Sequence, residues 1–285
     1  MHFYFDCIPC LTRQAVDSVK MVTQDYILQE KIIRLVLREM EQLDFSNNPP
    51  YMSRLIHKII KEKTGHPDPY KEIKNHFNQD ALNLYEYLEE TVQNSPFPFE
   101  QAIRFAASAN IIDFGLSSNI TMKQVKKTLQ DSLDKQIKGN TAHELAQEIK
   151  HAKKILYLGD NCGEIVMDKL LLTRMPREKV TFVVKGQPII NDAIMEDAEF
   201  AGITDLVRVI DNGSDVPGTI LKLCSNSFLR EFAEADLIIA KGQGNYECLN
   251  EIKNKKIFFI FKVKCPVVAD LTNCSVGDIV LKKHS

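Results

Sequence analysis

The chain has 285 residues, of which 44% are hydrophobic, so it is long enough for two domains around a substantial apolar core. Its 36 basic and 38 acidic side chains give a formal net charge of −2, which offers no general attraction to nucleic acid or to an anionic membrane surface. No apolar run approaches the roughly 20 residues that a transmembrane helix requires, so a membrane partner is not expected.

The N-terminus and the cysteines indicate the compartment. Residues 1–7 contain no basic segment followed by an apolar core, so no secretory signal is expected. The seven cysteines are odd in number and scattered along a long chain, which argues against a disulfide framework. We therefore expect a reduced, cytoplasmic protein.

Residues 1 to about 150 show the hydrophobic spacing of helices, interrupted by prolines, glycines and asparagines. The predicted helices are Leu11–Leu43, Met52–Lys63, Tyr70–Gln93, Phe99–Ile112, Thr121–Ile137 and Thr141–His151. No strong strand is expected before residue 150. We therefore predict an all-helical N-terminal region, residues 1–150, which caps the active site.

After residue 150, short β-rich runs alternate with segments of helical length. The predicted strands are Lys154–Leu158, Val180–Val184, Leu206–Ile210, Leu237–Ile239, Ile257–Lys262 and Ile279–Leu281. Strands that are separated by helices form right-handed βαβ units and a mostly parallel sheet. The sequence therefore predicts an α/β fold class, with this sheet in residues 151–285.

The first of these strands ends in a dense group of polar residues. Asp160, Asn161 and Glu164 follow it within a few positions, and Asp192 follows the next strand. Ligands bind at the carboxyl ends of strands in an open α/β sheet, and oxygen donors suit a hard cation such as Mg²⁺ or Mn²⁺. Asp160, Asn161 and Asp192 are therefore the candidate metal ligands. The alternative is that Asn161 and Asp192 only cap helices.

Lysines and glycines follow the other strands. Lys185 and Lys241 come directly after apolar strands, where we expect them to meet a phosphate. The segment Gly242-Gln243-Gly244-Asn245 lets backbone N–H groups approach an anion closely. Ser214, after a further strand, serves either a phosphate or a turn. Parallel strands bring such ends to one rim, so together they favour one shared site over separate helix caps.

A second feature is the pair Cys7-Ile-Pro-Cys10, whose spacing suits a soft metal or a redox couple. Cys265 becomes a third partner if the N-terminus folds back over the sheet. No second Cys-x-x-Cys accompanies the pair, so a four-cysteine zinc site is not supported. The alternative is that these are two buried thiols at the start of a helix.

Several motifs together resemble the damage-control metal-dependent phosphatase family, long known only as a domain of unknown function. Three motifs are Gly159-Asp-Asn-Cys-Gly-Glu164, Lys185-Gly-Gln-Pro-Ile-Ile-Asn-Asp192 and Asp236-Leu-Ile-Ile-Ala-Lys-Gly-Gln-Gly-Asn-Tyr246. The segment Ala109-Asn110-Ile-Ile-Asp113-Phe-Gly115 resembles the family's Gly-Asn-x-x-Asp, with Ala109 in place of the Gly. The segment Asp6–Gln14, with its Cys-x-x-Cys, resembles the start of the short prokaryotic and archaeal branch. The resemblance extends from residue 6 to residue 266.

This resemblance implies a Rossmann-like α/β domain with one divalent metal (Mn, Ni, Co or Mg), which Asp160, Asn161 and Asp192 hold. It also implies that a small phosphorylated metabolite is the substrate. The residues expected to contact that substrate are Glu164, Lys185, Asn191, Lys241, Gly242, Gln243, Gly244, Asn245, Asn110 and Asp113.

One position departs from the pattern of the larger eukaryotic branch. That branch carries an Arg-Thr-x-Lys motif near its C-terminus, whereas this chain reads Lys264-Cys265-Pro266-Val267. The final Lys is missing, so a phosphate contact is either lost or supplied by another lysine, such as Lys185 or Lys262.

The predicted function is therefore metal-dependent hydrolysis of small phosphomonoesters such as sugar phosphates, in metabolite damage control. A metal would polarise phosphoryl oxygens and lower the pKa of bound water, while lysines neutralise charge. Glu164 would orient the attacking water or take its proton. Asp160 as a covalent nucleophile stays open, although the chain lacks the Asp-x-Asp of haloacid-dehalogenase-type phosphatases.

Two other functions are alternatives. One is a nucleotide-cofactor enzyme such as a dehydrogenase or methyltransferase, but Gly159 to Gly163 does not form the Gly-x-Gly-x-x-Gly fingerprint. The other is a non-enzymatic metal-binding or redox module built on Cys7 and Cys10. Nucleic-acid binding is not expected, because no basic stripe with interleaved aromatic residues is present.

Overall fold

The structure is a computed structural model, and it describes residues 1–108 and 136–284. The helices in these ranges are α1 (Cys7–Val22), α2 (Tyr26–Glu41), α3 (Pro49–Thr64), α4 (Lys71–Gln93), α5 (Pro98–Ser108), α7 (Ala142–His151), α8 (Glu164–Leu172), α9 (Met195–Phe200), α10 (Asn226–Glu234), α11 (Gln243–Leu249) and α12 (Pro266–Thr272). The strands are β1 (Ile137–Gly139), β2 (Ile155–Leu158), β3 (Val180–Val184), β4 (Arg208–Asp211), β5 (Leu237–Lys241), β6 (Ile257–Lys262) and β7 (Ile279–His284).

The described strands form one seven-stranded sheet in the order β1-β7-β6-β5-β2-β3-β4. Neighbouring strands are parallel, except that β6 and β7 are antiparallel. The order runs outward from β2 to β4 on one side and from β5 to β6 on the other, which is the doubly wound arrangement of Rossmann-like folds. The predicted α/β fold class with a mostly parallel sheet is therefore confirmed.

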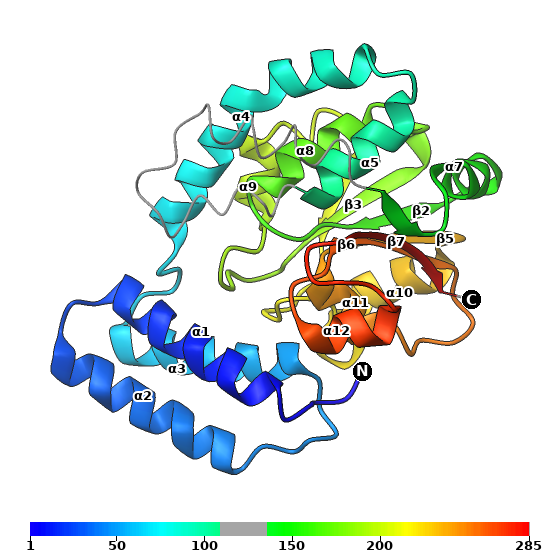
Figure 1. The fold of residues 1–285 in the computed structure, drawn as a ribbon. Coiled ribbons are helices and arrows are strands. Elements are labelled where there is room, and N and C mark those ends of the chain that lie inside the picture. The colour runs from blue at the N-terminus through cyan, green and yellow to red at the C-terminus, as the bar shows by residue number, and fades with distance from the viewer. Residues whose placement is uncertain (109–135, 285) are drawn as a thin grey trace.

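Helices cover both faces of the sheet (Figure 1). Helices α4, α5 and α8 lie on one face, whereas α10, α11 and α12 lie on the other. Alternate residues of each strand enter the two cores: Tyr157 packs with the first set of helices, while Leu156 and Leu158 pack with the second. Because both faces are buried, the central strands consist of continuous apolar runs, which made them visible in the sequence.

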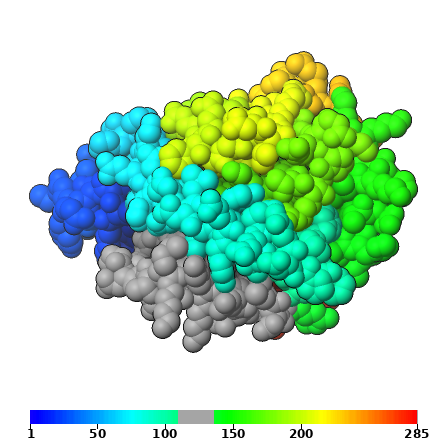
Figure 2. Space-filling model, turned by 90° about the horizontal axis from the view of Figure 1, so that it is seen from above, coloured from blue at the N-terminus to red at the C-terminus, as the bar shows by residue number. Residues whose placement is uncertain are grey.

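The first three helices have a core of their own. It includes Leu11 and Val19 of α1, Ile32 of α2, and Met52 and Ile56 of α3. These helices form one end of the molecule, drawn from blue to light blue in Figures 1 and 2. Helices α4 and α5, by contrast, share the core of the sheet.

Two details of the helical region differ from the prediction. The predicted helix Leu11–Leu43 is divided into α1 and α2, because the side chain of Asp25 accepts hydrogen bonds from the backbone N–H groups of Ile27 and Leu28 and so begins a new helix. The region is also not helical as far as residue 150, because β1 pairs with β7. A strand of three residues carries too little pattern to be recognised without its partner.

Two further predictions about the helical region are not tested by the structure. The predicted helix Thr121–Ile137 lies outside the described residues up to residue 135. The division of the chain into two domains near residue 150 stays a prediction. Among the described helices, none combines the length and hydropathy that a membrane span requires.

The loops after β3 and β4 pack backbone against backbone. A Cβ atom at Gly186 would lie 2.6 Å from the carbonyl carbon of Gly213, so Gly186→Ala requires the two loops to separate. We expect the substitution to lower the free energy of unfolding by about 1–3 kcal/mol, as overpacking does, measured by urea denaturation.

Gly65→Ala is the control for this prediction, because no atom lies within 4 Å of a Cβ atom at that position. Gly65 has a φ of 72°, so its own substitution costs only the strain of that backbone conformation, about 1 kcal/mol. An unchanged denaturation midpoint in Gly186→Ala would contradict the close packing.

Candidate active site

The candidate site lies where the strand order reverses, between β2 and β5. At this point of a doubly wound sheet, the loops that follow the two neighbouring strands run in opposite directions. A crevice therefore opens at the carboxyl ends of the two strands. Asp160 follows β2, and Gly242 follows β5 with a φ of 81°. A Cβ atom at Gly242 would overlap the carboxylate of Asp160, so the acid lies directly against the glycine backbone. The close approach of these two segments, and not only the positive φ, requires a glycine here.

The three predicted metal ligands lie side by side. Asn161 and Asp192 form an isolated antiparallel bridge, which joins the turn after β2 to the loop after β3. The backbone N–H of Cys162 donates to the carbonyl of Asn191 at 2.8 Å, and that of Ala193 donates to the carbonyl of Asp160 at 2.9 Å. Two strand ends that the sequence separates are therefore joined into one rigid rim, although metal binding itself stays a prediction.

Three buried acids meet at this rim. The side-chain amide of Asn161 donates to Asp160 Oδ2 at 3.2 Å and to Glu164 Oε1 at 2.9 Å, so it bridges the two carboxylates. Burial, together with the charge of Asp160, raises the pKa of Glu164 to about 8. Burial likewise raises the pKa of Asp192 to about 7, although nearby Lys185 opposes this. Such concentrations of perturbed acids are typical of functional sites.

The site offers oxygen donors of two kinds. Within the described ranges, no group of three or more His, Cys, Asp or Glu side chains is arranged to hold a metal ion. The predicted set combines the carboxylates of Asp160 and Asp192 with the amide of Asn161. Each of these residues is at most 7% exposed, so little water competes for their oxygens.

The two predicted phosphate lysines are buried and already paired. Lys185 is 3% exposed, and its ammonium donates to the carbonyl of Gly218 at 2.6 Å and lies 3.4 Å from Asp192 Oδ2. Lys241 is 1% exposed, and its ammonium lies 2.6 Å from Asp168 Oδ1. In this arrangement, both ammonium groups neutralise the protein's own acids. Their contact with a phosphate stays a prediction.

Asp168 is a residue that the sequence analysis missed. It is fully buried, and its Oδ1 accepts hydrogen bonds from Lys241 and, at 2.8 Å, from the hydroxyl of Tyr157. Burial raises its pKa, while Lys241 opposes the rise. Its position in the sequence could have identified it, because it is the one acid inside the apolar run of α8, four residues after Glu164.

The segment from residue 242 to residue 245 holds the strand ends together. The Asn245 side chain donates to the carbonyl of Lys241 at 2.7 Å and accepts from the hydroxyl of Thr219 at 2.7 Å. A Cβ atom at Gly244 would lie 2.7 Å from the carbonyl oxygen of Pro217, so that glycine also serves close packing. These contacts are structural, and substrate contact by this segment stays a prediction.

Gln243 connects the site to the predicted cysteine group. Its amide donates to Glu247 Oε1 at 2.8 Å and lies 3.5 Å from the sulfur of Cys265. Cys7 and Cys10 begin α1, and both thiols lie within the electrostatic influence of Cys265, so the N-terminus folds back toward that residue. Partial desolvation raises the pKa of both thiols, and the charges of Cys265 and Glu247 add to it. Cys7 is only partly buried and Cys10 is exposed, so the alternative of two buried thiols is wrong. Metal binding or redox chemistry at this group stays a prediction.

Helices α3 and α4 hold the loops of the site in place. Arg54 of α3 pairs with Asp215 at 2.5 Å, and Lys61 of α3 donates to the carbonyl of Pro188. Asn78 of α4 accepts a hydrogen bond from the backbone N–H of Gly163 at 2.6 Å. These contacts join residues more than 80 positions apart, so no local pattern predicts them. The predicted substrate residues Asn110 and Asp113 lie outside the described residues.

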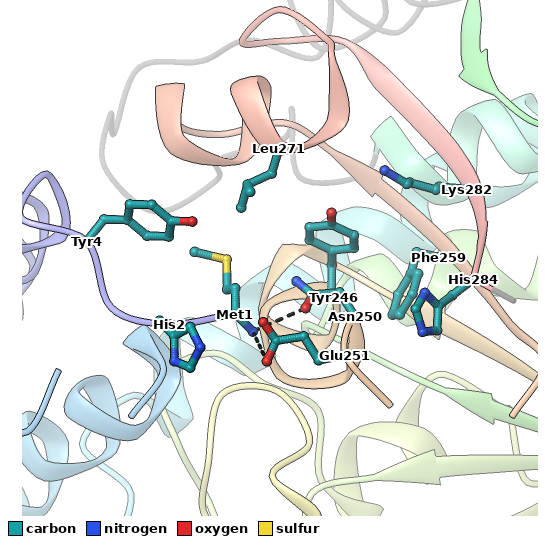
Figure 3. Close-up of a pocket in the computed structure, with 10 residues that line it drawn as sticks. All are labelled: Met1, His2, Tyr4, Tyr246, Asn250, Glu251, Phe259, Leu271, Lys282 and His284. Carbon is teal, nitrogen blue, oxygen red and sulfur yellow. Dashed lines mark hydrogen bonds and ion pairs between the residues drawn. The ribbon is translucent and has the colours of Figure 1, made fainter. Parts of the chain in front are cut away.

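A pocket of about 210 Å³ lies elsewhere, beside the N-terminus (Figure 3). It is lined by Met1, His2, Tyr4, Tyr246, Asn250, Glu251, Phe259, Leu271, Lys282 and His284. The amine of Met1 donates to Asn250 Oδ1 at 3.2 Å and pairs with Glu251 at 3.6 Å. The predicted site residues do not line this pocket.

The buried pair of Lys241 and Asp168 generates a prediction. Asp168→Asn leaves the ammonium of Lys241 buried without a counter-charge, so we expect a loss of about 3–5 kcal/mol in the free energy of unfolding, measured by urea denaturation. Glu234→Gln is the matched control, because its pair with Lys154 is more than half exposed and should contribute at most about 1 kcal/mol. Equal losses in the two variants would contradict the prediction.

Glu247 generates a prediction about pH. Burial raises its pKa from 4.5 to about 7, so the folded protein holds a proton that the unfolded chain releases. Its contribution to stability is complete below pH 4.5 and is lost as the pH rises to about 7. Glu247→Gln removes this loss, so the variant should gain on the order of 3 kcal/mol relative to the unchanged protein between pH 4.5 and pH 8.

Urea denaturation of both proteins across this pH range measures the effect. The difference between the two proteins isolates Glu247, because the other buried acids are common to both. A difference that does not vary with pH would show that Glu247 does not titrate as its burial requires.

The sequence of this chain is similar to a known protein family and to several archaeal proteins. The family model of the damage-control phosphatase ARMT1-like domain matches residues 4–280. A damage-control phosphatase of Pyrococcus horikoshii is 33% identical, with 100% of this chain and 99% of that one covered. A damage-control phosphatase of Archaeoglobus fulgidus is also 33% identical, with 97% of each chain covered. An uncharacterised protein of Methanocaldococcus jannaschii is 37% identical over 98% of this chain and 94% of its own.

A solved structure agrees with the fold. The crystal structure of a DUF89-family protein from Pyrococcus horikoshii has a TM-score of 0.92 and 31% sequence identity, and each chain is covered completely. The family expected from the motifs is therefore confirmed over nearly the whole chain. This chain belongs to the ARMT1-like damage-control phosphatase family.

Proposed function

We propose that this protein is a divalent-metal-dependent phosphatase that hydrolyses small phosphomonoesters, such as sugar phosphates, in metabolite damage control. The observation that carries the proposal is the group of three buried acids, Asp160, Glu164 and Asp192, at the point where the strand order reverses. Membership of a phosphatase family gives the reaction class, and the acids give the chemistry of the site.

The chemistry of the donors supports a hard or borderline divalent ion: Mg²⁺, Mn²⁺, Co²⁺ or Ni²⁺. Asp160, Asn161 and Asp192 would hold it, because they offer oxygens on one buried rim. Within the described residues, Asp192 Oδ2 is buried without a hydrogen-bond partner, and the ammonium of Lys185 lies 3.4 Å from it. When bound, the ion would supply charge for the phosphoryl oxygens and lower the pKa of water.

Glu164 is suited to move the proton. Its pKa of about 8 lies close to neutral pH, where a group both accepts and donates protons effectively. The amide of Asn161 holds Glu164 Oε1 at 2.9 Å, which fixes the direction of the carboxyl group. Glu164 therefore takes the proton of the attacking water and returns it to the leaving oxygen.

Asp160 is better placed to hold than to attack. Its carboxylate lies against the backbone of Gly242 and receives the amide of Asn161, so its movement is restricted on two sides. Attack by water is accordingly the route that we propose. The three acids are at most 7% exposed, so little bulk water reaches them.

The test is phosphate release from p-nitrophenyl phosphate and a panel of sugar phosphates. Protein stripped of metal should be inactive, and Mg²⁺, Mn²⁺, Co²⁺ or Ni²⁺, added singly, should restore activity. Asp192→Asn should lower kcat/KM by at least about 100-fold, because a ligand and its charge are both weakened. Its helix content, measured by circular dichroism, should be unchanged.

Asp270→Asn is the matched control, because it removes the same charge from an exposed position on α12. Full turnover in Asp192→Asn would refute the assignment of the site. Activity that is the same with and without metal would refute the metal dependence while leaving the family's reaction class intact.

A further inference from the structure

A phosphatase site needs a cation that is available to its substrate. A phosphomonoester carries up to two negative charges, and the crevice already contains three buried acids. Lys185 and Lys241, the lysines expected from the sequence, are 3% and 1% exposed and are each paired with a carboxylate of the protein. A substrate bound by either lysine would have to share the ammonium with a buried carboxylate of the protein.

Lys264 lies at the same rim but is exposed. It follows β6 by two residues, and β6 is the parallel neighbour of β5, so its backbone emerges beside the loop that begins at Gly242. The backbone N–H of Lys264 donates to Gln243 Oε1 at 2.8 Å. Gln243 is adjacent to Gly242, which lies against the carboxylate of Asp160. A short chain of contacts thus fixes the backbone of Lys264 relative to the acids.

The side chain of Lys264 is exposed, so its ammonium is accessible to a substrate. Among residues 1–108 and 136–284, the Lys264 ammonium has no ion pair of its own.

We propose that Lys264 binds the phosphate group of the substrate at the mouth of the crevice, while Lys185 and Lys241 stay paired with Asp192 and Asp168. The inference rests on the proposed phosphatase function and names the residue that recognises the phosphate. Lys264 contributes an accessible cation, and the two buried lysines balance the charge of the acids around it. The phosphate contact that the sequence comparison left to Lys185 or Lys262 is thereby assigned to Lys264.

Binding of inorganic phosphate tests the proposal without requiring turnover. The affinity for inorganic phosphate is measured by isothermal titration calorimetry on the full chain. The protein is loaded with the metal that supports its activity, or with Mn²⁺ if none does. Lys264→Gln should bind phosphate about 10- to 100-fold more weakly than the unchanged protein. Lys264→Arg should retain most of the affinity. Lys253→Gln is the matched control, because it removes one exposed lysine before β6, at the opposite end of that strand.

Steady-state kinetics give a second readout. Lys264→Gln should raise KM for a phosphomonoester more than it lowers kcat, since it removes a contact made already in the bound substrate. Because Lys264 is exposed, the variant should melt at the same temperature as the unchanged protein, and a purely structural role would not produce this KM effect.

The outcomes separate the two proposals. Phosphate affinity in Lys264→Gln equal to that of the unchanged protein would overturn the role of Lys264, as would an equal loss in Lys253→Gln. A loss of affinity in Lys262→Gln alone would also overturn it and assign the contact to that neighbour. If no metal supports hydrolysis but Lys264→Gln still loses phosphate, the phosphatase proposal fails while the phosphate site stands.

Discussion

Several acids are buried together at the carboxyl ends of β2 and β3, and the arrangement of the site follows from this concentration of charge. Asp160, Glu164 and Asp192 are each less than a tenth exposed, so their mutual repulsion is only weakly screened by water. Two features reduce this repulsion. The pKa values of Glu164 and Asp192 are raised, and Lys185 lies beside Asp192. Such a group lowers stability, and its presence is understandable if a bound cation offsets the repulsion.

Around this group of acids, glycines allow chain segments to approach more closely than any side chain would permit. Gly242 leaves room for the carboxylate of Asp160, and Gly244 packs against the carbonyl of Pro217. Gly186 brings the loops after β3 and β4 into direct contact. These contacts make the rim rigid, which matters because metal ligands and catalytic acids must be held within a fraction of an ångström.

The helical region completes the site from outside the sheet. Helices α1, α2 and α3 have a separate core, yet Arg54 and Lys61 of α3 reach the loops after β4 and β3. Asn78 of α4 reaches the turn at Gly163. The loops that carry the acids are therefore held between the sheet and the helices of this region.

The sequence by itself determined the fold class, and it predicted which strand ends form the candidate site. The buried strands of a parallel sheet are continuous apolar runs, and polar residues directly after them must gather at one rim. For this reason Asp160, Asn161 and Asp192 could be predicted to lie together, and the family could be recognised from their motifs.

Only the tertiary structure decided how the charges of the site are paired. The partner of Lys241 is Asp168, 73 residues away, and the backbone that anchors Lys264 is held by Gln243. The short strand β1 likewise exists only through its pairing with β7. Sequence patterns report on neighbours within a few residues, whereas the partner of a buried charge is chosen by which segments the folded chain brings together.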